Sequence, residues 1–381
     1  MCGIVGYVGA QQAAPILLEG LQKLEYRGYD SAGIAVLDGS TIELAKACGE
    51  IKNLLAKTHD GSDLHGYIGL GHTRWATHGA PTEANAHPHV SNDGKFAIVQ
   101  NGIIENFMEL REMLQAKGFR FHSETDTEVI VHLLDMYYTG DGNLKDTVLK
   151  TLGRLEGSYA IGILCADCPE QMFLARNGCP LIIGVGAGEN FFASDVTALV
   201  SHTKNVVYLD DGELAEVRAD SYTVFDCAGK PIEKPVSRVA WDIEAAEKGG
   251  YEHFMLKEIM EQPRAIKSTL DPRVKDHRVV FDELKMTDAQ LMGFNKIMIT
   301  ACGSAFYAGQ AGKYALEKLT HIPVDADLAS EFRYRDPIVD EHTLMIIISQ
   351  SGETADTIAA IREAQSKGAY VLSIVNLAGR T

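Results

Sequence analysis

The sequence has no long hydrophobic run: nowhere in its 381 residues are more than a few consecutive positions apolar. A helix that crosses a membrane needs about 20 predominantly apolar residues, so no membrane span is predicted. A secretory signal peptide is not predicted either, because no basic segment precedes an apolar one near Met1. We therefore expect a soluble protein with a cytoplasmic location.

Positive charge is also scarce. Lysine and arginine number 35 against 52 aspartates and glutamates, which gives a formal net charge of -17. Binding to the backbone of a nucleic acid or to an anionic membrane depends on clustered positive charge, and repulsion would oppose it here. We expect neither kind of partner, although local backbone amides could still hold a small anionic substrate.

Cysteine is too irregularly placed for a disulfide framework. The chain has seven cysteines, an odd number, which fits a reducing compartment. Cys165 and Cys168 form a single CxxC pair, and zinc sites of this kind use a second pair. Four histidines lie between residues 72 and 89, but their spacing matches no metal-binding pattern, so hydrogen bonding in loops is the simpler interpretation. No metal and no cofactor are predicted.

Hydrophobic residues are abundant, at 46% of the chain, and the length exceeds that of one ordinary domain. Within residues 1–230, strands and helices are grouped, which predicts an α+β domain with layered antiparallel sheets. Residues 231–284 are predicted to form a largely helical linker. Residues 285–381 alternate between strand and helix, which is typical of a doubly wound α/β domain with a parallel sheet. Because the chain stops after a predicted strand, we expect this second domain to be incomplete.

The periodicity of apolar residues predicts the main elements. In the first domain the expected strands are 4–8, 34–37, 67–71 and 96–99, the expected helices are 11–24, 104–117 and 127–138, and short strands follow between residues 158 and 225. In the second domain the expected strands are 297–300, 324–326, 344–348 and 371–375, and the expected helices are 307–319 and 357–367.

Cys2 directly follows the initiator methionine. If Met1 is removed, Cys2 carries a thiol and a free α-amino group. An α-amine titrates near about 8, so it can accept the thiol proton around neutral pH, directly or through a water molecule. Cys2 is therefore a candidate nucleophile with its own base. The alternative is a buried cysteine that simply opens the first strand.

Candidate partners of this nucleophile lie further along the chain. Asn101 and Gly102 follow the predicted strand 96–99 and could stabilise an oxyanion, although an Asn-Gly pair is also common in turns. Asp126 lies at the start of the predicted helix 127–138, where an acid can also act merely as a helix cap.

A second candidate site lies in residues 349–354, a serine-rich loop between a predicted strand and a predicted helix. Backbone N–H groups, small hydroxyls and the helix dipole converge on an anion at such a position. Cys302, Gly303 and Ser304 end another predicted strand and strengthen the prediction of a phosphate site.

Five motifs occur in order in the first domain: CGIVG at 2–6, YRGYDSAG at 26–33, GHTRWATHG at 71–79, QNGIIEN at 100–106 and SETDTE at 123–128. Together they resemble the N-terminal-nucleophile (Ntn) glutaminase domain of the class II glutamine amidotransferases. Residues 256–263, 302–304 and 349–357 resemble the linker and the sugar isomerase (SIS) domain of the glutamine:fructose-6-phosphate aminotransferase family. The likeness covers essentially the whole chain and favours Cys2 as a nucleophile.

The resemblance implies a role for each matching residue. The catalytic residues would be Cys2, which attacks the side-chain amide of L-glutamine, and Asn101 and Gly102, which form the oxyanion hole. Glutamine would be bound by Arg74, Thr77, His78 and Asp126, and Trp75 would gate the passage of ammonia. The sugar phosphate would be bound by Ser304, Ser349, Gln350, Ser351 and Thr354.

The implied activity is transfer of the glutamine amide nitrogen to D-fructose 6-phosphate with isomerisation, giving D-glucosamine 6-phosphate and glutamate. The family's isomerase residues lie beyond Thr381, so this chain alone is expected only to hydrolyse glutamine, and the longer protein is expected to be a homodimer through SIS domains. Two residues depart from the family pattern: Ala305 stands in place of a hydroxyl residue, and Gln100 in place of a histidine. Two alternatives stay open, namely another sugar-phosphate acceptor and a non-catalytic sugar-phosphate-binding regulator.

Overall fold

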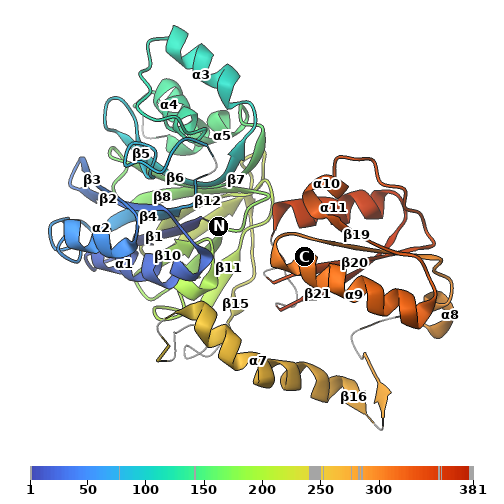
Figure 1. The fold of residues 1–381 in the computed structure, drawn as a ribbon. Coiled ribbons are helices and arrows are strands. Elements are labelled where there is room, and N and C mark those ends of the chain that lie inside the picture. Colours follow the sequence, from blue (N-terminus) through green and yellow to red (C-terminus); the bar gives the residue numbers. More distant parts are fainter. Residues whose placement is uncertain are drawn as a thin grey trace. The chain divides into compact units, whose positions relative to one another are not determined.

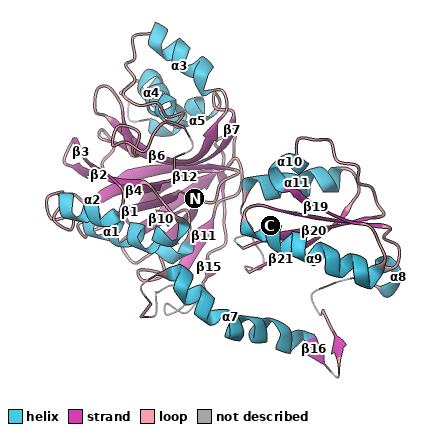
Figure 2. Ribbon diagram, in the orientation of Figure 1, coloured by secondary structure: helices cyan, strands magenta, loops and turns pink. Residues whose placement is uncertain are grey.

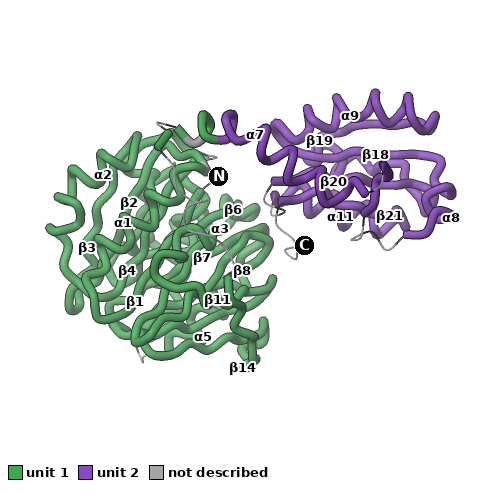
Figure 3. Tube along the Cα trace, turned by 90° about the horizontal axis from the view of Figure 1, so that it is seen from below, with its two compact units in different colours: residues 1–257 green, residues 258–381 purple. Residues whose placement is uncertain are grey.

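The computed structural model describes residues 2–76, 78–140, 143–239, 250–251, 253–275, 277–281, 284, 286–350, 352 and 354–376. The chain divides into two compact units, residues 1–257 and 258–381 (Figure 3). Helix α7 (Phe254–Leu270) begins in the first unit and continues in the second.

Two antiparallel sheets form the centre of the first unit. Among the described residues, the first sheet has eight strands in the order β15 (Ser237–Arg238), β11 (Asn205–Tyr208), β9 (Ile182–Val185), β10 (Asn190–Ala193), β1 (Gly3–Val8), β4 (Ile68–Arg74), β2 (Ser31–Asp38) and β3 (Thr41–Cys48). The second has seven, within the same described ranges, in the order β14 (Pro231–Ile232), β13 (Tyr222–Phe225), β12 (Leu214–Arg218), β8 (Gln171–Asn177), β7 (Gly157–Cys165), β6 (Phe96–Ile104) and β5 (His89–Val90). The strands β14 and β15 lie after residue 230, so both sheets extend past the predicted domain boundary.

Helices cover the outer faces of the two sheets (Figures 1 and 2). The helices α1 (Ala13–Lys23) and α2 (Ile51–Lys57) pack with β1 and β2 in one core cluster. On the other side, α3 (Phe107–Ala116), α4 (Glu128–Tyr137) and α5 (Leu144–Leu152) pack against β6 and β7. The unit therefore has four layers, helix, sheet, sheet and helix, which confirms the predicted α+β class with layered antiparallel sheets.

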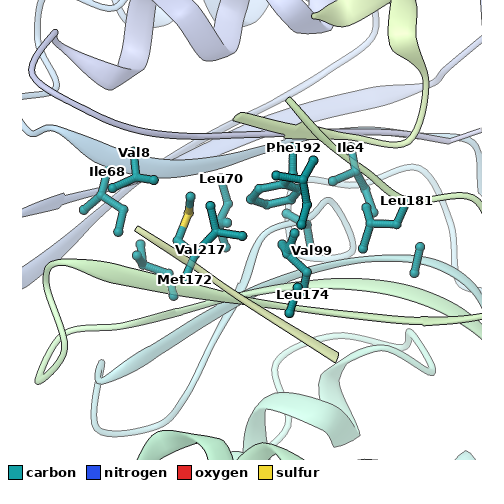
Figure 4. Close-up of a cluster of buried hydrophobic side chains, with 14 of the residues drawn as sticks. Ile4, Val8, Ile68, Leu70, Val99, Met172, Leu174, Leu181, Phe192 and Val217 are labelled. Atoms are coloured by element: carbon teal, nitrogen blue, oxygen red, sulfur yellow. The ribbon is translucent and has the colours of Figure 1, made fainter. Parts of the chain in front are cut away.

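A third cluster fills the space between the sheets (Figure 4). Strand β1 shows how the sequence specifies this arrangement, because Ile4 and Val8 face the other sheet while Val5 and Tyr7 face the helices. Side chains of a strand alternate between its faces, so a strand buried on both faces is apolar throughout. Full burial of each large apolar side chain contributes about 1.5–3 kcal/mol.

The second unit contains a parallel sheet in the order β19 (Val324–Leu328), β18 (Lys296–Ala301), β20 (Thr343–Ser349) and β21 (Tyr370–Val375). Helix α9 (Ser304–Thr320) packs with one face of the sheet, whereas α10 (Ala329–Phe332) and α11 (Ala355–Ser366) pack with the other. Helices on both faces of a parallel sheet confirm the predicted doubly wound fold. The short strands β16 (Val274–Lys275) and β17 (Arg278–Val279) and helix α8 (Asp288–Leu291) precede it.

Most predicted elements are present, with shifted ends. The predicted strand 96–99 continues to Ile104 in β6, so the interpretation of Asn101-Gly102 as a turn is wrong: both residues pair with β7. Helix α1 begins at Ala13, which leaves Pro15 in the first turn, as required. The helices α2 and α5 and the strand β3 were not predicted. Of the predicted helical linker 231–284, residues 240–249, 252, 276, 282 and 283 lie outside the described residues. None of the described helices is both long and apolar enough to cross a membrane.

Candidate active site

Cys2 lies where the first sheet meets the second. Strand β1 pairs with β4 so that Gly3 lies opposite Thr73, which places Cys2 beside the residues that follow β4. The backbone N–H of Trp75 donates a hydrogen bond to Cys2 Sγ at 3.1 Å. Burial raises the pKa of the Cys2 thiol, while the Trp75 hydrogen bond acts in the opposite direction. A thiol with a raised pKa needs a base to become a nucleophile.

Asn101 reaches Cys2 from the second sheet. Its carboxamide Nδ2 donates to the Cys2 carbonyl oxygen at 3.3 Å. The next residue, Gly102, has a φ of 114°, and a Cβ there would lie 2.1 Å from the Ser158 carbonyl oxygen. Only glycine fits this backbone. Strand β6 thus brings the Asn101 carboxamide to the backbone of Cys2, and Gly102 follows it in the same strand.

Arg74 ends β4 and is buried, with 4% of its surface exposed. Its guanidinium donates to the carbonyl oxygens of Gly79, at 3.1 Å, and Ala80, at 3.2 Å, and also to that of His78. The same loop is held at Ala76, whose N–H donates to Asp30 Oδ2 at 2.5 Å. Arg74 therefore organises the segment that follows Trp75, and it provides a buried positive charge near the thiol.

Asp126 is also buried, with 4% of its surface exposed. Its Oδ2 accepts a hydrogen bond from the backbone N–H of Ile104 at 2.8 Å. It therefore joins the end of β6 rather than capping α4, whose N-cap residue is Thr127. Burial raises the pKa of the Asp126 carboxyl, and the charges of His78 and Arg74 partly oppose this shift.

The remaining predicted glutamine-site residues are less tightly placed. The His78 ring packs edge-on against Phe107, with 5.4 Å between ring centroids. Trp75 is 54% exposed, and its indole lies against Gly28, where a Cβ would approach to 2.5 Å. Thr77 lies outside the described residues. Of the predicted site residues, Trp75 and Asn101 are hydrogen-bonded to Cys2.

Two residues near this site had no predicted role. Asp30 holds the loop at Ala76, although it belongs to a quoted motif. His72 Nε2 lies 3.0 Å from Asn101 Oδ1, whereas the sequence offered His72 only as a loop residue or metal ligand. Neither contact could be read from sequence spacing, because each joins residues that only the fold brings together. Among the described residues, no group of three or more histidines, cysteines and acids could hold a metal ion.

In the second unit, two helices begin at the same edge of the parallel sheet. Helix α9 starts at Ser304 after β18, and α11 follows β20 with Thr354 as its N-cap residue. Strands β18 and β20 are neighbours. After β18 the chain continues to β19 at one edge of the sheet, and after β20 it continues to β21 at the other edge. Ligands of doubly wound folds bind at this switch point. The arrangement suits an anion.

The predicted sugar-phosphate residues lie around this edge. Ser349 ends β20, and its Oγ accepts a hydrogen bond from Gly352 N at 3.1 Å. Ser304 and Gln350 are exposed, and Thr354 is half-buried. Ser351 lies outside the described residues. Four of the five predicted residues can therefore be placed, all at the two helix N-termini or the end of β20.

Comparison with known proteins agrees with both regions. The glutamine amidotransferase domain family matches residues 50–229, and the SIS domain family matches residues 290–381. Proteins named glutamine–fructose-6-phosphate aminotransferase (isomerizing) are 54% identical over 380 residues in Caldanaerobacter subterraneus subsp. tengcongensis, 51% over 382 in Clostridium tetani and 47% over 381 in Thermus thermophilus. Each match includes 100% of this chain and 62% of the relative, so the chain spans less than two thirds of these proteins.

A solved structure shares the fold. The glutamine phosphoribosylpyrophosphate amidotransferase from B. subtilis, complexed with ADP and GMP, matches 98% of this chain and 81% of its own, with a TM-score of 0.53 and 20% identity. Residues 50–229 thus match a glutamine amidotransferase domain and residues 290–381 an SIS domain, and the chain is similar along its whole length to proteins named glutamine–fructose-6-phosphate aminotransferase (isomerizing).

Proposed function

We propose that this chain hydrolyses the side-chain amide of L-glutamine, with Cys2 as the nucleophile. The observation that carries the proposal is the meeting of Cys2, from the first sheet, with Asn101, from the second. A nucleophile and a hydrogen-bond donor for an oxyanion are the two groups that acyl transfer requires.

The proposed mechanism starts with removal of Met1, which frees the α-amine of Cys2. The amine accepts the thiol proton, and Sγ attacks the amide carbon of glutamine. The resulting oxyanion accepts hydrogen bonds from Asn101 Nδ2 and from the N–H of Gly102. The C–N bond then breaks, ammonia leaves with the proton from the α-ammonium, and water hydrolyses the γ-glutamyl thioester to glutamate. A raised thiol pKa is consistent with the need for this base.

The same proposal assigns the substrate contacts. Arg74 would pair with the α-carboxylate of glutamine, since its planar guanidinium matches two oxygens. Asp126 would hold the α-ammonium group, and Thr77 and His78 would line the pocket. Trp75 would gate the release of ammonia. The burial of Arg74 and Asp126 supports these assignments, because buried charges interact strongly with an ionic substrate.

Glutamate release from glutamine tests the proposal. The Cys2→Ala protein should lose the activity, whereas Cys48→Ala, which changes another half-buried free cysteine, should retain it. Mass spectrometry of the active protein should find Cys2 as the first residue. Glutamate release by Cys2→Ala would refute the nucleophile, and full activity with Met1 retained would refute the proposed base.

We further propose that the complete protein transfers the amide nitrogen to D-fructose 6-phosphate, with isomerisation to D-glucosamine 6-phosphate. The support comes from the names of relatives near 50% identity and from the paired helix N-termini beside Ser304 and Ser349. Gln350, Ser351 and Thr354 would complete the phosphate site. A homodimer through SIS domains and a cytoplasmic location belong to the same proposal.

The complete protein, incubated with glutamine and fructose 6-phosphate, should form glucosamine 6-phosphate. Parallel reactions with other sugar phosphates identify the acceptor. If an aminated product forms from one of these sugar phosphates and not from fructose 6-phosphate, that sugar phosphate is the acceptor and the proposal of fructose 6-phosphate is wrong. Glutamate release without any aminated sugar would overturn the transfer function and leave the glutaminase proposal intact.

A further inference from the structure

Two polar side chains, His72 and Asn101, lie between the two sheets of the first unit at one end of the apolar cluster. Strand β4 directs Ile68 and Leu70 toward the second sheet, and β6 directs Ala97 and Val99 toward the first. With the two-residue period of a strand, the next positions on these faces are His72 and Asn101. His72 Nε2 lies 3.0 Å from Asn101 Oδ1, and the His72 side chain is fully buried.

The hydrogen bonds fix which atoms donate. Asn101 faces the Cys2 carbonyl oxygen, which only accepts, so the group at 3.3 Å must be the NH2 of the carboxamide. The Oδ1 atom therefore faces His72, and His72 Nε2 must carry the proton that it donates. Within the part of the chain that the structure describes, the buried His72 Nδ1 has no hydrogen-bond partner, which fits a neutral ring protonated at Nε2. Burial lowers the pKa of His72 to about 3, so the ring stays neutral at working pH.

A second imidazole fixes the same part of β6. The ring of His87 stacks on His72 with 4.2 Å between centroids, and its Nδ1 accepts from Gln100 N at 3.3 Å. His87 Nε2 then donates to Thr127 Oγ1 at 3.2 Å, and Thr127 Oγ1 donates to Gln100 Oε1 at 2.7 Å. These hydrogen bonds are mutually consistent with a His87 ring protonated at Nε2 and with Gln100 Oε1 facing Thr127, and they hold the residue before Asn101.

We propose that His72 is a positioning residue for glutamine hydrolysis: it holds the Asn101 carboxamide with its NH2 toward Cys2 and the reacting amide. Without this hydrogen bond, the carboxamide could rotate and present Oδ1, an acceptor, to the oxyanion. Catalysis by an oxyanion hole depends on donors that are oriented before the reaction. This inference rests on the proposed glutaminase function. Within that function, His72 of the first sheet would orient Asn101 of the second.

Replacing His72 by phenylalanine preserves a ring for stacking and removes the donor. For His72→Phe we expect a fall in kcat of about 10–100-fold with little change in KM, because the oxyanion forms only after substrate binding. His72→Gln, whose amide can donate, should retain more activity than His72→Phe. His89→Phe is the matched control, because His89 is buried beside His87 but contacts Thr125 and not Asn101. The kcat of the His89→Phe protein should stay within about twofold of that of the unaltered chain.

A double-mutant cycle with Asn101→Ala separates positioning from general damage. Adding His72→Phe to Asn101→Ala should lower kcat by less than about twofold, because the target of His72 is already absent. An undiminished loss in that background, or an equal loss in His89→Phe, would overturn the proposal. Absence of Cys2-dependent glutamate release from the unaltered chain would overturn the glutaminase function and this inference together. Thermal unfolding of each variant identifies misfolded protein, and His72→Gln provides the comparison if His72→Phe does not fold.

Discussion

The two candidate sites of this chain are built in different ways. Around Cys2, side chains from β4 and β6 already contact one another, and the charged groups of Arg74 and Asp126 are buried. In the second unit, exposed Ser304 and Gln350 lie at helix N-termini, and backbone groups dominate. We propose that the first arrangement orients groups for a reaction and that the second binds an anion through backbone N–H groups and the helix dipoles. At the first site, changes to Cys2 and Asn101 should therefore affect turnover and changes to Asp126 should affect substrate binding, whereas changes at the second site should affect binding alone.

The largest effect within this comparison is expected for Asn101→Ala. If Asn101 donates to the oxyanion as proposed, its removal should lower kcat for glutamine hydrolysis by about 100–1000-fold while KM changes little. Steady-state glutamate release measures both constants. A KM effect as large as the kcat effect would contradict the view that the first site is organised for the transition state.

An intermediate effect is expected for Asp126→Asn. The asparagine retains an acceptor for Ile104 N but loses the charge that would hold the α-ammonium of glutamine. A hydrogen bond to a charged group contributes about 1.5–3 kcal/mol, so KM should rise about 10–100-fold.

The raised pKa of Asp126 also determines how glutamine binding and stability change with pH. Glutamine binding favours the carboxylate, so KM of the unaltered chain should rise as the pH falls through this raised pKa, and Asp126→Asn should lack that rise. Stability behaves in the opposite sense: the folded-state pKa exceeds the unfolded one, so the stabilising contribution is complete at low pH and is lost as pH rises through the folded value. Asp126→Asn should therefore gain stability relative to the parent at neutral pH. Unfolding curves measured at several pH values test this. A difference in free energy of unfolding between the two proteins that does not change with pH would contradict the prediction.

The smallest effect is expected for Ser349→Ala in the second unit. Ser349 would donate one of several hydrogen bonds to the charged phosphate. At about 1.5 kcal/mol, the lower end of the range for a hydrogen bond to a charged group, the affinity of the complete protein for fructose 6-phosphate should fall about tenfold, with glutamine hydrolysis unchanged. Calorimetric titration measures the affinity. Ser366→Ala is the control, since Ser366 lies at the far end of α11 and its Oγ donates to the Glu363 carbonyl oxygen within the same helix. Loss of glutaminase activity in Ser349→Ala would contradict the separation of the two sites.

Much of the fold followed from patterns of apolar residues. Both faces of β1 are buried, and the run of apolar residues from Ile4 to Val8 predicted a strand there. The elements that were missed have weaker apolar patterns: β3 is largely half-exposed, and α5 is a short helix with few buried residues, although Asn143 caps its start. The Asn-Gly pair shows a clearer limit. Local preference favours a turn, yet pairing with β7 keeps both residues in β6.

The sequence by itself determined the chemistry available to this protein: a cysteine beside the initiator methionine, the ordered motifs around it and a serine-rich loop before a helix. Only the tertiary structure decided how those groups are oriented. Asp126 bonds to β6 rather than capping its own helix, and His72 meets Asn101 across two sheets. Such contacts depend on which strands pair and which faces stack, and these are properties of the whole fold that no local spacing encodes.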